Sequence, residues 1–242
     1  MKKSIILILV SLIALVACKK EKWTERRIDP VDFLSGNRFT SLVIQVVSER
    51  GYSLNSKTNE NLVAFLSSRL NKPGGIQIVS KEVEPNGKAY INSADLIEIE
   101  RKYRTEFSKG STLTAFVFVS GSQYAGNYGD FKILGIQYGE TGVALFGRTI
   151  DDYSGGLNQP SSTTLQTTVA EHEFGHLLGL VNSGTKMRNY HEDGSHAHHC
   201  NNENCLMFHA VETSDIIKNL LNDRVPELDN NCVIDLQYNG GK

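Results

Sequence analysis

Two histidines and a glutamate in the segment HEFGHLLGL, residues 172 to 180, have the spacing of half a zinc site. On an α-helix, positions four residues apart lie on the same face, so His172 and His176 can bind one ion at about 2.0 to 2.1 Å from each nitrogen. Glu173 follows the first histidine directly, where its carboxylate can reach a metal-activated water without ligating the metal. The spacing predicts two metal ligands, His172 and His176, and a general base, Glu173.

Apolar residues surround this segment, which argues against a chance motif on a solvent-facing helix. Leu165 and Val169 precede it, and Leu177 and Leu178 follow the second histidine. Burying two histidines and a glutamate without partners is costly. Gly179 weakens a helix interior by roughly 1 kcal/mol and is the usual residue for a left-handed stop. We therefore expect a buried helix that ends in a sharp turn at Gly179.

The pattern H-E-x-x-H-x-x-G resembles the front of the metzincin signature, a clan of zinc endopeptidases in which a third ligand stands three residues after the glycine. That position is Asn182 here, and asparagine is a poor zinc ligand beside imidazole or carboxylate. The third ligand must lie elsewhere in the chain. All seven histidines fall within 38 consecutive residues: His172, His176, His191, His196, His198, His199 and His209.

The segment HCNNENCLM, residues 199 to 207, resembles the H-C-x4-C-x-M segment of archaemetzincins. In that family the histidine is the third zinc ligand and the methionine forms the turn under the metal. The resemblance implies that His199 is the third ligand and that Met207 forms the Met-turn, with Met187 as a rival. It requires a sixteen-residue insertion at 183 to 198, so the alternatives for the third ligand stay open: His191, His196, His198 and Asp193.

Two other interpretations compete with this assignment. In gluzincins a downstream glutamate is the third ligand, and Glu192, Glu203 or Glu212 can be proposed for that position. Gly179 and the C-x-M turn argue against it. The second alternative is a membrane-anchored binding lipoprotein with a structural or vestigial zinc site, because four donors that close on a metal leave no position for water.

Three cysteines belong to the folded part of the chain. Archaemetzincins use four cysteines for a second, structural zinc, and Cys200 and Cys205 stand in two of the matching places. Together with Cys232, and with His209 as a fourth ligand, they can form a second zinc site. In an oxidising compartment a disulfide competes with that site, most simply between Cys200 and Cys205. We favour the disulfide and expect one catalytic Zn²⁺.

The N-terminus predicts export and lipid anchoring. Lys2 and Lys3 precede an apolar run that is too short to span a bilayer, which is typical of a secretory signal peptide over residues 1 to 17. The run ends in LVAC, which resembles a bacterial lipobox with Cys18 as the acylated residue. Residues 18 to 38 then form the lipidated cysteine and a tether to the membrane. We therefore expect a location in the bacterial cell envelope.

Composition favours a single domain over residues 39 to 242. The chain has 242 residues, 40% of them hydrophobic, and a net charge of −2, which is ordinary for one globular unit. Its Lys and Arg residues are scattered, so nucleic acid is not an expected partner. We divide the domain into an N-terminal subdomain that extends to about residue 180 and a C-terminal subdomain after it, and we expect a monomer.

The alternation of apolar patterns predicts an α+β fold. We expect a mixed, mostly parallel sheet backed by helices, followed by the active-site helix, the Met-turn and a C-terminal helix over residues 211 to 223, as the resemblance to metzincins implies. The edge strand that binds extended substrate should lie within residues 131 to 146. The strands are expected at 41–48, 76–83, 112–119, 131–138 and 143–146, and the helices at 59–70, 93–108 and from about 161.

These observations predict a zinc-dependent endopeptidase. The metal would be held by His172, His176 and His199, and would activate a water molecule and polarise the scissile carbonyl. Glu173 would take the proton of the water and pass it to the leaving amine. The expected partners are a protein or peptide substrate and the membrane that holds the lipid anchor.

Overall fold

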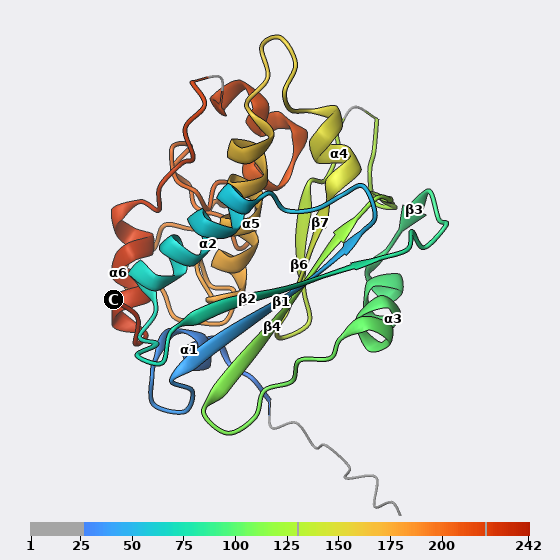
Figure 1. The fold of residues 1–242 in the computed structure, drawn as a ribbon. Coiled ribbons are helices and arrows are strands. Elements are labelled where there is room, and N and C mark those ends of the chain that lie inside the picture. Colours follow the sequence, from blue (N-terminus) through green and yellow to red (C-terminus); the bar gives the residue numbers. More distant parts are fainter. Residues whose placement is uncertain (1–26, 130, 221) are drawn as a thin grey trace, which may run out of the picture.

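The computed structural model describes residues 27–129, 131–220 and 222–242 (Figure 1). The predicted signal peptide and the lipidation site, Cys18, lie outside these ranges. Within them, no helix has both the length and the apolar character needed to cross a membrane.

A five-stranded sheet with the order β2-β1-β4-β7-β6 forms the centre of the molecule (Figure 1). Neighbouring strands are parallel except for β6, which runs antiparallel to β7 at the edge. A two-stranded sheet, β3-β5, stands apart from it. The strands are β1 (Ser41–Glu49), β2 (Ile76–Val83), β3 (Tyr90–Ile91), β4 (Thr112–Ser120), β5 (Gln123–Tyr124), β6 (Gly135–Tyr138) and β7 (Gly142–Phe146).

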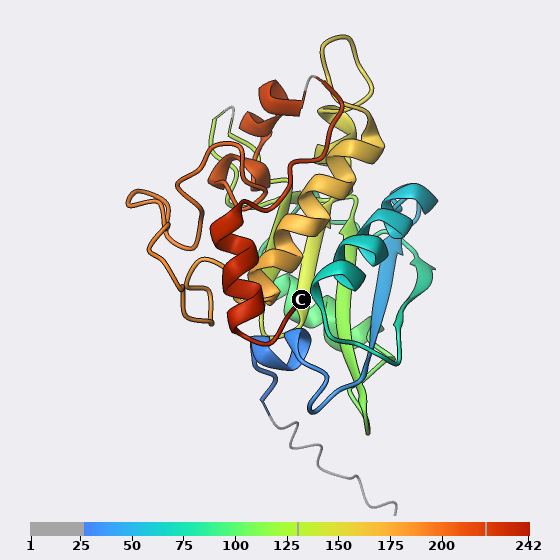
Figure 2. The same ribbon diagram turned by 90° about the vertical axis from the view of Figure 1, so that its left-hand side faces the viewer.

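Successive residues of a strand point to opposite faces of the sheet. In the central strands both sets of residues are largely apolar, so both faces are buried. On β4, Ala115 and Val117 face the larger core, whereas Phe116 and Phe118 face the smaller one. The larger core lies between the sheet and two helices, α2 (Ser56–Arg69) and α5 (Ser162–Leu177). Figures 1 and 2 show both helices on the same face of the sheet, with α3 (Ser93–Tyr103) on the opposite face.

The fold class is confirmed: the structure is a mostly parallel mixed sheet backed by helices. Side-chain caps fix the main helices, since Asn55 accepts a hydrogen bond from Thr58 N and Ser161 accepts one from Thr164 N. The strands predicted from residues 41, 76 and 112 begin where expected. The strand predicted from residue 131 starts at Gly135, and the helix predicted to residue 108 ends at Tyr103.

The predicted C-terminal helix over residues 211–223 is wrong. This region forms two 3₁₀ segments, η1 (His209–Glu212) and η2 (Ser214–Leu220). Asp223 adopts a φ of +54° and Pro226 follows it, so the segment cannot continue as an α-helix. The C-terminal helix is instead α6 (Asn230–Tyr238), where the Asp229 side chain caps Cys232 N.

The folded part also begins earlier than the predicted boundary at residue 39. A short helix, α1 (Pro30–Leu34), lies within the segment assigned to the tether, and Phe33 and Leu34 on it are fully buried in the larger core. Ile28 is buried as well. A further short helix, α4 (Gly147–Asp152), follows β7 and was not predicted.

Candidate metal centre

Helix α5 carries the three motif residues at its C-terminal end, in the interior of the molecule. His172 and Glu173 are fully buried and His176 is 8% exposed. The helix packs against β6 and β7 on one side and α2 on another. It ends as predicted: Gly179 has a φ of +79°, and a Cβ there would lie 2.7 Å from Thr185. Glycine is therefore required at this turn.

The two histidine side chains are positioned to share one ion. Their Nε2 atoms are 3.1 Å apart, close to the roughly 3.3 Å that two tetrahedral ligands at 2.0 to 2.1 Å would show. His172 Nδ1 lies 2.7 Å from the carbonyl oxygen of Leu206, so it donates to that oxygen and leaves Nε2 as the ligand atom. Burial, followed by the charge of His199, lowers the pKa of His172 to about 4. The neutral, metal-binding form therefore dominates at neutral pH.

His199 completes a triangle of imidazoles. Its ring centroid is 5.4 Å from that of His172 and 5.0 Å from that of His176. The Nδ1 atom lies 2.9 Å from the carbonyl oxygen of Ala197, whereas Nε2 is buried without a hydrogen-bond partner among the described residues. Such an orphaned nitrogen, beside two others, fits a bound cation. The structure therefore brings together the three histidines that the sequence predicted.

Glu212 lies in the same group, on η1. One ligand atom from Glu212 and one from each of the three histidines all lie within 4.8 Å of one another. Its Oε2 atom is 3.6 Å from His199 Nε2. The sequence offered Glu212 only as one of three glutamates for a different clan, because nothing in its local pattern separates it from Glu192 and Glu203. The structure adds it beside the predicted histidines.

The other candidates for the third ligand lie elsewhere. His191 belongs to the cysteine cluster described below, and Asp193 and His196 form a group with His209. His198 is exposed and does not join any of these groups. Its backbone has a positive φ of +66°.

The carboxylate of Glu173 is fully buried, and neither of its oxygens has a hydrogen-bond partner among the described residues. It lies against β6, where a Cβ at Gly135 would be 3.0 Å from Glu173 Oε1. Burial, and next the charge of Glu212, raises the pKa of Glu173 well above its usual range. A cation bound to the adjacent imidazoles would oppose that shift. An unpaired, buried carboxylate is costly unless a cation lies nearby.

Met207 lies under this helix. It is fully buried, and its Sδ atom would be 2.2 Å from a Cβ at position 175. Gly175 therefore leaves the space that Met207 fills. The preceding carbonyl, of Leu206, is the one that accepts from His172. Met187, the rival candidate for the Met-turn, is a half-buried residue of the insertion that packs against the larger core.

Comparison with solved structures identifies the fold. Archaemetzincin from Methanopyrus kandleri superposes with a TM-score of 0.55 at 14% identity, over 83% of this chain and 96% of that one. A zinc-dependent peptidase from Methanocorpusculum labreanum gives a TM-score of 0.50 at 13% identity, over 80% and 99%. The fold is archaemetzincin-like. Neither the family models nor the curated proteins contain a match to this sequence.

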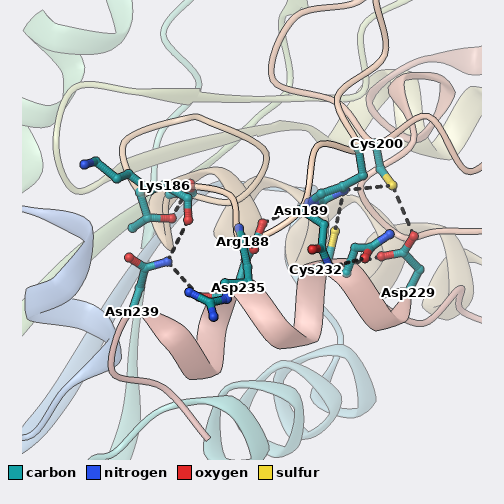
Figure 3. Close-up of polar contacts among 12 residues, drawn as sticks. Lys186, Arg188, Asn189, Cys200, Asp229, Cys232, Asp235 and Asn239 are labelled. Atoms are coloured by element: carbon teal, nitrogen blue, oxygen red, sulfur yellow. Dashed lines mark hydrogen bonds and ion pairs between the residues drawn. The ribbon is translucent and has the colours of Figure 1, made fainter.

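Within this archaemetzincin-like fold, a second buried cluster contains the three cysteines. Figure 3 shows two of them, Cys200 and Cys232, at the start of α6. All three are free thiols, so the favoured Cys200–Cys205 disulfide is absent from the described residues. Cys205 Sγ is 3.6 Å from Cys232 Sγ. His191 Nδ1 is 3.4 Å from Cys200 Sγ and 4.0 Å from Cys232 Sγ. Tetrahedral zinc with such ligands would separate sulfurs by about 3.8 Å and nitrogen from sulfur by about 3.6 Å.

Neighbouring carboxylates support this second cluster. His191 Nε2 lies 2.9 Å from Asp235 Oδ2, an arrangement that fixes the ring of a metal-bound histidine. Among the three coupled thiols the pKa of Cys205 is lowered to about 4, whereas the pKa values of Cys200 and Cys232 are raised, so Cys205 is the favoured thiolate. Asp229 Oδ2 is 3.4 Å from Cys200 Sγ. The predicted fourth ligand, His209, was wrong: His191 from the insertion stands in that place.

Proposed function

We propose that this protein is a zinc-dependent endopeptidase. The observation that carries the proposal is the joint position of three imidazoles and one unpaired carboxylate: His172, His176 and His199 converge, and Glu173 is buried beside them. Three protein ligands and an adjacent general base form the pattern of catalytic rather than structural zinc sites. The archaemetzincin-like fold agrees with this chemistry but does not by itself establish it.

Each part of the site has a role in peptide hydrolysis. Zinc, when bound, supplies Lewis-acid activation of the water and of the scissile carbonyl. Glu173 accepts a proton from the attacking water at its carboxylate and delivers it to the leaving nitrogen. β6 forms the edge of the sheet and lies against α5, so an extended substrate can add to it by main-chain hydrogen bonds. Gly135 lets β6 approach α5 closely, because a Cβ there would lie 2.5 Å from Val169 and 3.0 Å from Glu173.

The experiment is metal-dependent hydrolysis of an unstructured protein such as casein. A chelator should abolish cleavage, and stoichiometric Zn²⁺ should restore it. The His172→Ala variant, which removes a ligand, should not be rescued at that zinc concentration. Cleavage that survives complete zinc removal, verified by elemental analysis, would exclude the proposed mechanism.

Glu212 favours one alternative function. Together with the three histidines it supplies four donors, and four protein ligands would close the zinc site and leave a binding lipoprotein without catalysis. The distinguishing comparison is wild type against Glu212→Gln. If the native site is closed, the wild type is inactive, and Glu212→Gln binds zinc more weakly than the wild type does. If the site is catalytic, the wild type cleaves peptides.

We propose that the cysteine cluster binds a second, structural zinc through Cys200, Cys205, Cys232 and His191. Ligand atoms of His191, Cys200 and Cys232, together with Asp229, lie within 4.8 Å of one another, and Cys205 Sγ is 3.6 Å from Cys232 Sγ, which supports a metal site over the disulfide. A closed four-ligand site would join the insertion to α6 and stabilise that part of the fold. Counting zinc in the wild type and in Cys232→Ser tests the assignment, since the variant should lose one equivalent.

We also propose that the chain is anchored in the bacterial cell envelope through acylated Cys18, as a monomer. The lipobox-like LVAC sequence supports the lipid anchor, and several acyl chains hold a protein at a membrane far better than one. Mass spectrometry of the N-terminal peptide from membrane fractions, compared between wild type and Cys18→Ala, tests it. An unmodified cysteine in the wild type would contradict it.

A further inference from the structure

A third group of ligand-type side chains lies outside both clusters described above. It consists of Asp193, His196 and His209, and one ligand atom from each lies within 4.8 Å of the others. The first two residues lie on the insertion of residues 183 to 198, and the third begins η1. No part of the resemblance to metzincins accounts for this group.

The group is arranged around one carboxylate oxygen. His196 Nδ1 lies 2.9 Å and His209 Nδ1 lies 3.5 Å from Asp193 Oδ2. The two rings are stacked, with centroids 3.6 Å apart and planes at 4°. The Nδ1 atom of His209 is buried without a hydrogen-bond partner among the described residues. Two ring nitrogens therefore lie beside one oxygen. A shared cation would satisfy His209 Nδ1 once the stacked rings turn apart, since the lone pair of each nitrogen lies in its ring plane.

Backbone hydrogen bonds hold these ligands in place. Ser195 N donates to Asp193 Oδ1 at 2.8 Å, which leaves Oδ2 for the rings. Asp193 N donates to the carbonyl of His199 at 2.8 Å, and His199 N donates to the carbonyl of His196 at 3.2 Å. The loop is thus ordered by its own contacts, and it is joined to His199.

We propose that Asp193, His196 and His209 bind a divalent first-row transition metal ion such as Zn²⁺, beside the catalytic centre. Two imidazoles and a carboxylate are ligand types that such ions accept. Three protein ligands leave coordination positions open, and the side chain of His196 is 45% exposed. The ion therefore binds more weakly here than at the two buried clusters and exchanges with solvent.

Glu212 links this third site to the catalytic one. It stands three residues after His209 on η1, and residues three apart eclipse one another in a 3₁₀ helix. Glu212 Oε2 lies 3.6 Å from His199 Nε2, and the Glu212 charge also opposes the lowering of the His209 pKa by burial. An ion bound by the third site therefore changes the electrostatic environment of the carboxylate beside the catalytic histidines.

The test is a calorimetric titration of the purified full-length chain with Co²⁺, after its tightly bound zinc has been counted. The wild type should show a weak binding event. In His196→Ala that event should weaken by at least about tenfold, since one of three ligands is lost. The matched control is His198→Asn, which removes a histidine from the same loop but not from the group. Asparagine tolerates the positive φ at this position.

A second variant guards against a misfolded loop. Asp193→Asn keeps the shape of the side chain but removes its charge, and it should weaken Co²⁺ binding as His196→Ala does. His172→Ala should retain the weak Co²⁺ binding event, because the two sites share no ligand. The third site can therefore be tested even if the protein proves to have no peptidase activity. The inference is overturned if the wild type shows no weak event, or if His196→Ala and His198→Asn bind Co²⁺ equally well.

Discussion

Replacing Glu173 by glutamine removes the proposed base with little change of shape. Glu173 is fully buried, and the amide has nearly the same volume as the carboxylate, so the substitution opens no cavity. General-base catalysis contributes about 10²- to 10⁴-fold, so kcat should fall by that factor, which corresponds to about 3 to 5 kcal/mol in the barrier. Zinc content should be unchanged, because the three histidines remain.

The assay is kcat/KM for an internally quenched fluorogenic peptide, with zinc counted in the same samples. Glu171→Gln is the matched control. Glu171 lies two residues away on the same helix, is buried, and has its pKa raised by burial to about 8, but it belongs to none of the metal-ligand groups. It should retain activity. A Glu173→Gln protein that holds zinc and cleaves the peptide at the wild-type rate would refute the assignment of the base.

Four further outcomes follow from the geometry. His199→Ala should lose the catalytic zinc and all activity, as measured by elemental analysis and peptide cleavage. Cys232→Ser should lower Tm, and zinc-free wild type, which lacks both proposed ions, should melt at a temperature at least as low. Gly175→Ala should destabilise the fold, because overpacking against Met207 costs about 1 to 3 kcal/mol. The higher helix propensity of alanine offsets only roughly 1 kcal/mol of that cost. Urea unfolding measures the net change in the free energy of unfolding. Folding lowers the pKa of His172 to about 4, so the unfolded chain binds more protons than the folded one between pH 6.5 and 4. The stability of the metal-free protein should therefore fall as the pH drops through this range. A Tm that rises as the pH drops would contradict the assignment.

The part of the site that follows from local periodicity could be predicted from the sequence. His172, Glu173 and His176 lie on one helix turn, so their relative positions follow from the spacing of four residues alone. The turn at Gly179 could likewise be predicted, because glycine has a specific conformational role there.

Long-range contacts could not be predicted in the same way. His191 joins the cysteine cluster from within an insertion of irregular sequence, and its partner Asp235 lies 44 residues away. Glu212 reaches the histidines from a 3₁₀ turn that the apolar pattern indicated as an α-helix. Phe33 and Leu34 lie in a segment whose charged beginning is typical of a tether, yet they pack into the core.

The most direct test of the central claim is a crystal structure with anomalous scattering measured at the zinc edge. The account predicts a zinc peak about 2.0 to 2.1 Å from the Nε2 atoms of His172, His176 and His199, with a coordination position open to solvent and Glu173 facing it. A peak with Glu212 as a fourth protein ligand, or no zinc among these histidines, would contradict a catalytic centre.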